Sequence, residues 1–169
     1  YALEIGKALG LPSEELETLR IGGIFHDIGK IGTADDILLK TDKLSEEELK
    51  EIQKHPLKGA RILSAVSMFK DVVPVVKCHH ERIDGTGYPE GLSGDSIPLL
   101  ARIISVADAF DAMLSDRAYR SRLTFEEARQ QLLNGSGTQF DSHIVSVFLE
   151  IIDKMKDTGL LHETETVRE

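Results

Sequence analysis

Apolar residues recur at helical spacing along almost the whole chain, and this periodicity is the feature that most limits the possible folds. An inner helical face is expected within residues 13–28, where apolar side chains stand at i, i+3, i+4 and i+7: Ile21, Ile24, Phe25 and Ile28. No segment has the alternation of apolar and polar residues that is typical of a half-buried strand. The sequence therefore predicts an all-α fold.

Capping residues and prolines predict where the later helices begin. In a capping box, a hydroxyl and a carboxylate three residues later bond each other's backbone amides. Proline suits the first helical turn because it has no amide hydrogen that needs a partner. The predicted starts are Ser45 (with Glu48), Pro56, Asp71, Pro98, Thr124 (with Glu127) and Asp141. The residues predicted to face inward on the helices after Pro98 and Asp141 are Leu100, Ile103, Ala107, Phe110 and Leu114, and Ile144, Phe148, Ile151 and Met155.

Residues 1–169 are expected to form a single domain that contains one long loop. The loop, residues 81–98, has four glycines and two prolines in eighteen residues, and loops of this length in compact domains are usually functional. Residues 162–169 are expected to be a polar tail. The chain opens on Tyr1 inside a helix-like stretch, so we expect it to be an N-terminally truncated fragment of a longer protein.

Composition excludes several classes of function. The chain has 20 Lys and Arg residues and 29 Asp and Glu residues, a net charge of −9, whereas proteins that coat nucleic-acid polymers are normally basic. The single cysteine, Cys78, excludes an internal disulfide and a cysteine-built zinc site, which fits a cytoplasmic protein. No apolar run reaches the roughly 18–20 residues that a membrane span needs, so no membrane contact is expected.

Histidines and carboxylates near helix ends form a candidate metal site. Taken alone, a helical histidine beside apolar residues is more often a hydrogen-bonded core residue than a ligand. The combination, without thiolates, favours two metal ions with a carboxylate between them, because adjacent helical residues diverge by about 100° and can face different ions. The candidate ligands are His26, Asp27, His55, His79, His80 and Asp108.

Three basic residues could bind phosphate. Lys30 follows Asp27 by three positions, so its amine would project over the same helical face, although a lysine that complements the helix dipole explains it equally well. Arg117 and Arg120 could place guanidinium groups on phosphate oxygens or guanine edges. Without further context, two arginines at a helix end are usually solvated.

Together these motifs resemble the HD-GYP domain, a bacterial subclass of the HD superfamily of metal-dependent phosphohydrolases. The resemblance covers nearly the whole chain, and the Gly-Tyr-Pro triplet at 87–89 marks the subclass. The matching segments are HDIGKIG (26–32), KHP (54–56), HHERIDGTGYP (79–89), IISVADAFDAM (103–113), SDRAYR (115–120) and GTQFD (137–141).

The resemblance implies a helical bundle around two or three divalent metal ions, with iron or manganese favoured. It implies hydrolysis of cyclic di-GMP to pGpG, and in some members to GMP, in second-messenger signal transduction. The six candidate ligands above match metal ligands of the family, and Asp27 matches the bridging one. Asp27 and Lys30 are the expected catalytic residues, and Lys30, Arg117 and Arg120 match contacts to the substrate phosphates.

The resemblance also gives the long loop a role. Within it, Gly85, Gly87 and Tyr88 are implied to border the substrate, and the segment 85–89 is implied to contact diguanylate cyclase domains. A sensory or receiver domain, and a further histidine ligand, are expected upstream of Tyr1.

Two other functions stay open at this point. One is an HD phosphohydrolase that acts on another nucleotide, which a panel of substrates would reveal. The other is a regulatory module that binds cyclic di-GMP or a cyclase domain without hydrolysis. Tight binding without turnover in metal-loaded protein would indicate that module.

Overall fold

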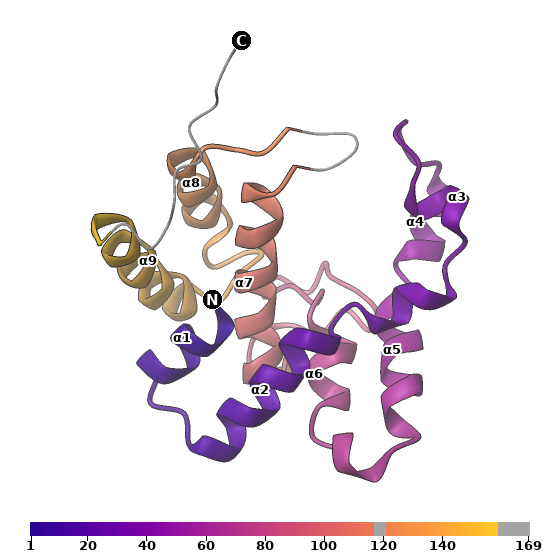
Figure 1. Ribbon diagram of the computed structural model, residues 1–169, viewed down its shortest axis with the longest axis horizontal. Helices are drawn as coiled ribbons and strands as arrows, with labels where there is room; N and C mark the ends of the chain where they lie inside the picture. Colours follow the sequence, from indigo (N-terminus) through magenta and orange to yellow (C-terminus); the bar gives the residue numbers. More distant parts are fainter. Residues whose placement is uncertain (117–120, 159–169) are drawn as a thin grey trace.

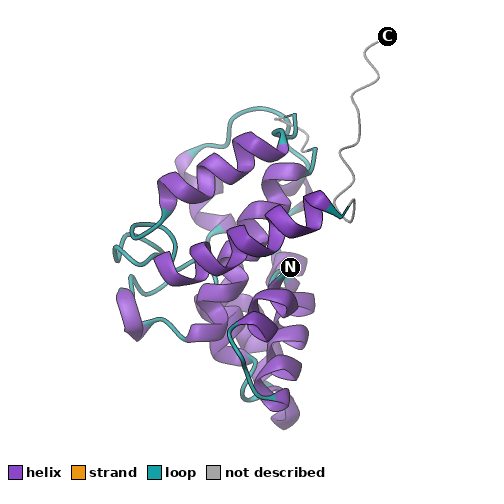
Figure 2. Ribbon diagram, turned by 90° about the vertical axis from the view of Figure 1, so that its left-hand side faces the viewer, coloured by secondary structure: helices purple, strands orange, loops and turns teal. Residues whose placement is uncertain are grey.

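The computed structural model describes residues 1–116 and 121–158. Within these residues the chain forms helices joined by turns and loops, with no strand, which confirms the all-α prediction (Figures 1 and 2). The α-helices are α1 (Ala2–Ala8), α2 (Ser13–Phe25), α3 (Asp35–Leu38), α4 (Glu46–Ile52), α5 (His55–Ser64), α6 (Val73–Cys78), α7 (Leu99–Leu114), α8 (Phe125–Gly135) and α9 (Ser142–Asp157). The 3₁₀ turns are η1 (Ile28–Gly32), η2 (Ser67–Phe69) and η3 (Gly94–Ser96). None of the helices described here is both long and apolar enough to cross a membrane.

One side of the molecule is an apolar bundle, formed by α1, α7, α8 and α9 (Figure 1). Its centre contains Ile103, Phe110 and Phe148, which are fully buried, as the periodicity of α7 and α9 predicts. The rings of Phe110 and Phe148 meet edge to face, with their centroids 5.1 Å apart. Since burial of apolar surface contributes about 25 cal/mol per Å², this bundle is the main stabilising core of the molecule.

The other side consists of α2, η1, α5 and α6, which pack closely because glycines lie between them. Gly22 is buried in α2, and a Cβ atom there would lie 2.9 Å from a methyl group of Val75 in α6. At Gly29 in η1, a Cβ atom would lie 1.9 Å from the carbonyl oxygen of His55 and 2.5 Å from the amide nitrogen of Gly59. Neither backbone atom can move cheaply, so only glycine lets η1 lie directly on α5.

Most predicted helix starts are confirmed. The capping boxes at Ser45 and Thr124 both form, with each hydroxyl accepting from the amide three residues later. Asp141 caps α9 by accepting from the amides of His143 and Ile144. These bonds join groups only two or three residues apart, which is why the sequence predicts them well.

Two details of the sequence analysis are wrong. Ile24 is 62% exposed, because Gly22 and Leu19 form the buried face of α2 and Ile24 points away from it. Asp71 does not cap α6, which begins at Val73 after Val72 and has no side-chain cap. Pro74 lies in the first turn of α6 and has no amide hydrogen, so one fewer donor at this end needs a partner.

Candidate metal centre

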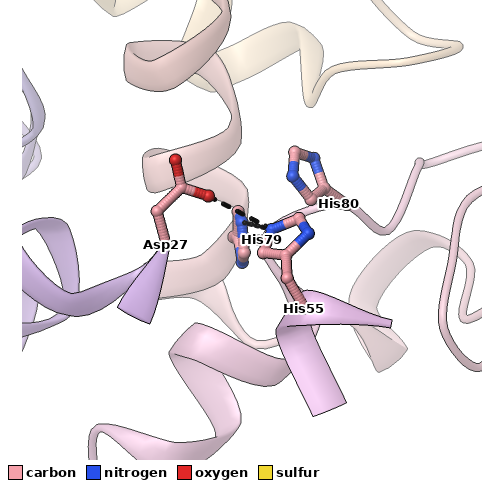
Figure 3. A group of neighbouring side chains, drawn as sticks. All are labelled: Asp27, His55, His79 and His80. Carbon is pink, nitrogen blue, oxygen red and sulfur yellow. Dashed lines mark hydrogen bonds and ion pairs between the residues drawn. The ribbon is translucent and has the colours of Figure 1, made fainter. Parts of the chain in front are cut away.

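Four side chains from three separate segments meet where η1, α5 and α6 come together (Figure 3). Asp27 lies between α2 and η1, His55 begins α5, and His79 and His80 follow the end of α6. One possible ligand atom from each of the four lies within 4.8 Å of the others. His55 is 1% exposed and His79 is fully buried, so the group lies inside the protein.

Three histidine rings are oriented by hydrogen bonds to their own backbone segments. The Nδ1 atoms of His26, His55 and His79 lie 2.7–2.8 Å from carbonyl oxygens three residues earlier in the chain. A carbonyl oxygen only accepts, so each Nδ1 carries the hydrogen and the lone pair is on Nε2. This is the arrangement of many metal-binding histidines, in which the second ring nitrogen is fixed by an outer partner.

The lone pairs on these Nε2 atoms converge without hydrogens between them. His55 Nε2 lies 3.3 Å from His79 Nε2 and 3.2 Å from Asp27 Oδ1. Asp27 Oδ1 is buried and accepts no hydrogen bond from any part of the chain that the structure describes. Because lone pairs facing each other repel and a buried carboxylate oxygen needs a partner, the arrangement fits a bound cation.

A second group of candidate ligands lies on the other side of the Asp27 carboxylate. His26 Nε2 is 3.5 Å from Asp27 Oδ2 and 3.5 Å from Asp108 Oδ1 in α7. Burial by itself lowers the pKa of His26, but a second proton, on Nε2, would be hydrogen-bonded to Asp108 and attracted by the charge of Asp27, and these interactions outweigh burial and raise the pKa. The two oxygens of Asp27 thus face different sets of neighbours, as a bridging carboxylate would require.

The electrostatics favour the neutral forms of His79 and His80. Burial, followed by the charge of His80, lowers the pKa of His79 to about 3. Burial, followed by the charge of His55, lowers the pKa of His80 to about 4. Burial would raise the pKa of Asp27, but interactions with His55 and Lys30 hold it well below its usual range. Neutral imidazoles and an ionised carboxylate are the protonation states in which these groups bind metals.

This geometry lies in a part of the chain that matches a known family. The family model described as HD domain matches residues 1–144. The chain belongs to the HD-domain family. This family, and the cyclic di-GMP phosphodiesterases among the relatives, agree with the resemblance to which the sequence motifs point.

Curated HD-domain relatives are similar over most of this chain. The cyclic di-GMP phosphodiesterase response regulator RpfG of Xanthomonas campestris is 42% identical over 147 residues, which are 86% of this chain and 39% of that protein. The 3'3'-cGAMP-specific phosphodiesterase 3 of Vibrio cholerae is 34% identical over 167 residues, which are 98% of this chain and 36% of that protein. The chain therefore spans well under half the length of these relatives.

Solved structures of HD-domain proteins share the fold. A cyclic GMP-AMP specific phosphodiesterase of V. cholerae superposes with a TM-score of 0.72 at 22% identity, over 97% of this chain and 44% of the other. The protein Bd1817 of Bdellovibrio bacteriovorus superposes with a TM-score of 0.71 at 24% identity, over 89% of this chain and 49% of the other.

The part of the long loop that contains the Gly-Tyr-Pro triplet, residues 85–89, lies against the histidine pair. The Tyr88 ring stacks on the His80 ring, with the centroids 4.9 Å apart and the planes at 28°. Gly85 has a φ of +78°, which an L side chain rarely adopts. A Cβ atom at Gly87 would lie 2.7 Å from the His80 carbonyl oxygen. Both glycines thus shape the loop that presents Tyr88 beside the candidate metal centre.

Of the three predicted phosphate-binding residues, Lys30 is the one that lies within the described part of the chain. Lys30 Nζ lies 2.6 Å from Asp27 Oδ2, so its amine does reach the candidate metal centre of this HD domain. It does so from the 3₁₀ turn η1, because α2 already ends at Phe25. Arg117 and Arg120, like the tail 162–169, lie outside the described residues.

One buried carboxylate beside the centre escaped the sequence analysis. Glu81 directly follows the histidine pair and is only 3% exposed, yet it is not part of the converging group. Its oxygens accept from the amides of Glu90 and Leu92, 2.7 and 3.0 Å away. The position after two histidines gives no signal for such bonds, because both partners lie nine or more residues further along the chain.

Proposed function

We propose that this HD domain is a metal-dependent phosphodiesterase that hydrolyses cyclic di-GMP to pGpG. The observation that carries this proposal is the Asp27 carboxylate, whose two oxygens face separate groups of candidate ligands. The similarity to cyclic di-GMP phosphodiesterases at 42% identity supports the substrate class. Relatives named 3'3'-cGAMP-specific phosphodiesterases make that cyclic dinucleotide the second candidate substrate.

We assign two or three divalent ions to the site, with iron or manganese as the favoured metals. The mixed nitrogen and oxygen donors suit these ions. The residues that would hold them are His26, Asp27, His55, His79, His80 and Asp108. Bound there, such ions lower the pKa of a coordinated water and polarise a phosphodiester.

The other residues bind and orient the substrate in this proposal. Lys30 would exchange its contact with Asp27 for a phosphate oxygen and neutralise charge that develops during the reaction. Arg117 and Arg120 would hold the phosphates, while Gly85, Gly87 and Tyr88 border the dinucleotide. The cytoplasm as location, an upstream sensory or receiver domain and contact of the loop with diguanylate cyclase domains complete the proposal.

A substrate panel tests the activity. The intact protein, loaded with Mn²⁺ or anaerobically with Fe²⁺, is incubated with cyclic di-GMP, 3'3'-cGAMP and mononucleotides. We expect hydrolysis of a cyclic dinucleotide, cyclic di-GMP fastest, and loss of both bound metal and turnover in Asp27→Ala. Asp157→Ala, which changes an exposed carboxylate at the end of α9, is the matched control and should retain both.

The outcomes separate the candidate functions. Turnover in Asp27→Ala at unchanged metal content would refute the metal mechanism. Turnover of mononucleotides alone would indicate an HD phosphohydrolase of another specificity. Tight binding of cyclic di-GMP without hydrolysis by metal-loaded protein would indicate a regulatory module.

A further inference from the structure

The histidines of the candidate metal centre are held in two different ways. His26, His55 and His79 each donate Nδ1–H to a backbone carbonyl, which fixes the rotation of the ring. The His80 ring makes no hydrogen bond within residues 1–116 and 121–158, and three rings lie against it instead: His79, His55 and Tyr88, with centroids 4.1, 4.9 and 4.9 Å away. Of these three, Tyr88 alone lies in the loop, so the orientation of His80 depends in part on whatever keeps Tyr88 in place.

Tyr88 is held by the fold of its loop over the end of α6. Its amide donates to the carbonyl oxygen of His80 at 3.2 Å. At the preceding residue, Gly87, a Cβ atom would lie 2.4 Å from the amide nitrogen of Arg82 and 2.7 Å from Cα of Glu81. The loop thus packs directly against the histidine pair, and the Tyr88–His80 stack persists only while residues 90–92 are also held in place.

The Glu81 side chain holds residues 90–92 in place. Its Oε1 accepts from the amide of Glu90 at 2.7 Å and its Oε2 from the amide of Leu92 at 3.0 Å. The segment 82–92 is therefore closed into a ring by the side chain of the residue that follows His80. Because both oxygens are occupied by amides, Glu81 is positioned to bind the loop rather than a metal ion.

Glu81 is also the buried anchor of the loop. The ion pairs Lys77–Glu90, 2.8 Å, and Arg82–Asp84, 2.8 Å, join side chains that are about 28–44% exposed, and exposed pairs contribute little. Glu81 is 3% exposed, so removal of its carboxylate would leave two amides without their partner. Loss of this residue should therefore loosen the loop more than loss of either ion pair.

We propose that Glu81 is a positioning residue for the metal ligand His80: its carboxylate holds the segment 82–92 closed, and the closed loop keeps Tyr88 stacked on the His80 ring. The proposal rests on the proposed function in one respect, the assignment of His80 as a ligand. It requires Glu81 to affect metal affinity without touching the metal. Substitution of such outer partners typically costs 10–100-fold in metal affinity or activity.

The test uses Glu81→Ala and the milder Glu81→Gln in the intact protein. Mn²⁺ affinity is measured by competition with a chelator, amide hydrogen exchange by mass spectrometry, and cyclic di-GMP turnover by product formation. Glu81→Ala should weaken Mn²⁺ binding by about tenfold and speed exchange in 82–92. Glu81→Gln should lie between Glu81→Ala and the unchanged protein, because its amide oxygen can still accept one of the two bonds.

Two further variants separate positioning from general loosening. Glu127 is the control, because its carboxylate also accepts a backbone amide, that of Thr124, but at the exposed start of α8. Glu127→Ala should leave Mn²⁺ affinity and exchange in 82–92 unchanged. Tyr88→Leu removes the stack but not the bonds of Glu81, so it should weaken Mn²⁺ binding while Glu90 and Leu92 stay protected.

Each remaining result counts against the proposal. Unchanged exchange in 82–92 of Glu81→Ala means that the carboxylate does not hold the loop. Faster exchange with unchanged Mn²⁺ affinity means that Glu81 is only structural. If the unchanged protein binds Mn²⁺ but hydrolyses no cyclic dinucleotide, the proposed function fails, whereas the affinity comparison still decides the role of Glu81. If it binds neither Mn²⁺ nor, anaerobically, Fe²⁺, both are wrong.

Discussion

The two sides of the molecule bring opposite kinds of side chain together in their interiors. The apolar bundle of α1, α7, α8 and α9 brings aliphatic and aromatic side chains together, and its interior contains fully buried residues such as Phe148. The side formed by η1, α5 and α6 brings histidines and a carboxylate together instead, with backbones in close contact at Gly29. The first arrangement is stabilised by apolar burial, whereas the second brings together lone pairs and a buried oxygen that a bound cation would satisfy.

The difference indicates that one side of the molecule contributes most of the stability and the other side contributes the candidate metal site. Burial of apolar surface stabilises the bundle whatever the solution contains. Convergent ligand atoms cost free energy until a metal ion binds, so they stabilise only the metal-loaded protein. Substitutions on the two sides should consequently separate the free energy of unfolding from metal affinity.

The largest effect is expected for His79→Leu, which replaces a fully buried histidine with an apolar side chain. Metal affinity and turnover should fall by well over about 100-fold, the upper cost of losing only an outer partner of a ligand, since a candidate ligand near the centre of the group is lost. The free energy of unfolding of the metal-free protein should stay the same or rise, because the 3.3 Å contact between two Nε2 atoms disappears. Denaturant unfolding with and without chelator measures this. A large loss of stability in the metal-free protein would show that His79 is a packing residue.

Phe148→Ala is the reciprocal change in the apolar bundle. It should lower the free energy of unfolding by about 3–5 kcal/mol, the usual cost of emptying a buried aromatic site. At temperatures where the protein stays folded, Mn²⁺ affinity should be unchanged, because the candidate ligand Asp108 lies on a different face of α7 from Phe110, the residue that contacts Phe148. Loss of Mn²⁺ affinity in folded Phe148→Ala would mean that the two sides are coupled.

Metal addition probes the same contrast without a substitution. At a free Mn²⁺ concentration about a hundred times Kd, a ligand that binds only the folded state adds about 2.7 kcal/mol to the free energy of unfolding. Thermal unfolding across an Mn²⁺ titration should show this gain in the unchanged protein and in Phe148→Ala. The gain should vanish in His79→Leu, and its persistence there would place the metal elsewhere.

The two sides also differ in how far the sequence predicts them. In the bundle, the inward residues of α7 and α9 follow from helical periodicity, and the caps follow from bonds between near neighbours. The candidate ligands can be singled out by residue type and motif, but their convergence depends on contacts between segments far apart in the chain. Nothing local shows that η1 lies on α5 or that Asp27 approaches His55.

Glycines and backbone acceptors account for what the sequence analysis missed. A periodicity argument counts apolar side chains, so it placed Ile24 inside and overlooked that Gly22 forms the close contact of α2. Glutamate is a residue type usually found at the surface, and Glu81 can be buried because two backbone amides of the folded loop donate to its carboxylate. Both errors arise because the decisive contacts are made by backbone atoms, which are the same in every residue and therefore leave no signal in the sequence.

The smallest expected effects come from the two capping boxes, which share one chemistry in different surroundings. Thr124→Ala should cost about 1 kcal/mol of global stability, because α8 buries Phe125 and Leu132 in the apolar bundle and unfolds with it. Ser45→Ala removes the equivalent bond from α4, a helix with no buried residue, so α4 can open locally without the core. Its midpoint of denaturant unfolding should hardly change, while amide exchange in residues 46–52 should become faster. Equal shifts of the midpoint in the two variants would mean that α4 unfolds together with the bundle.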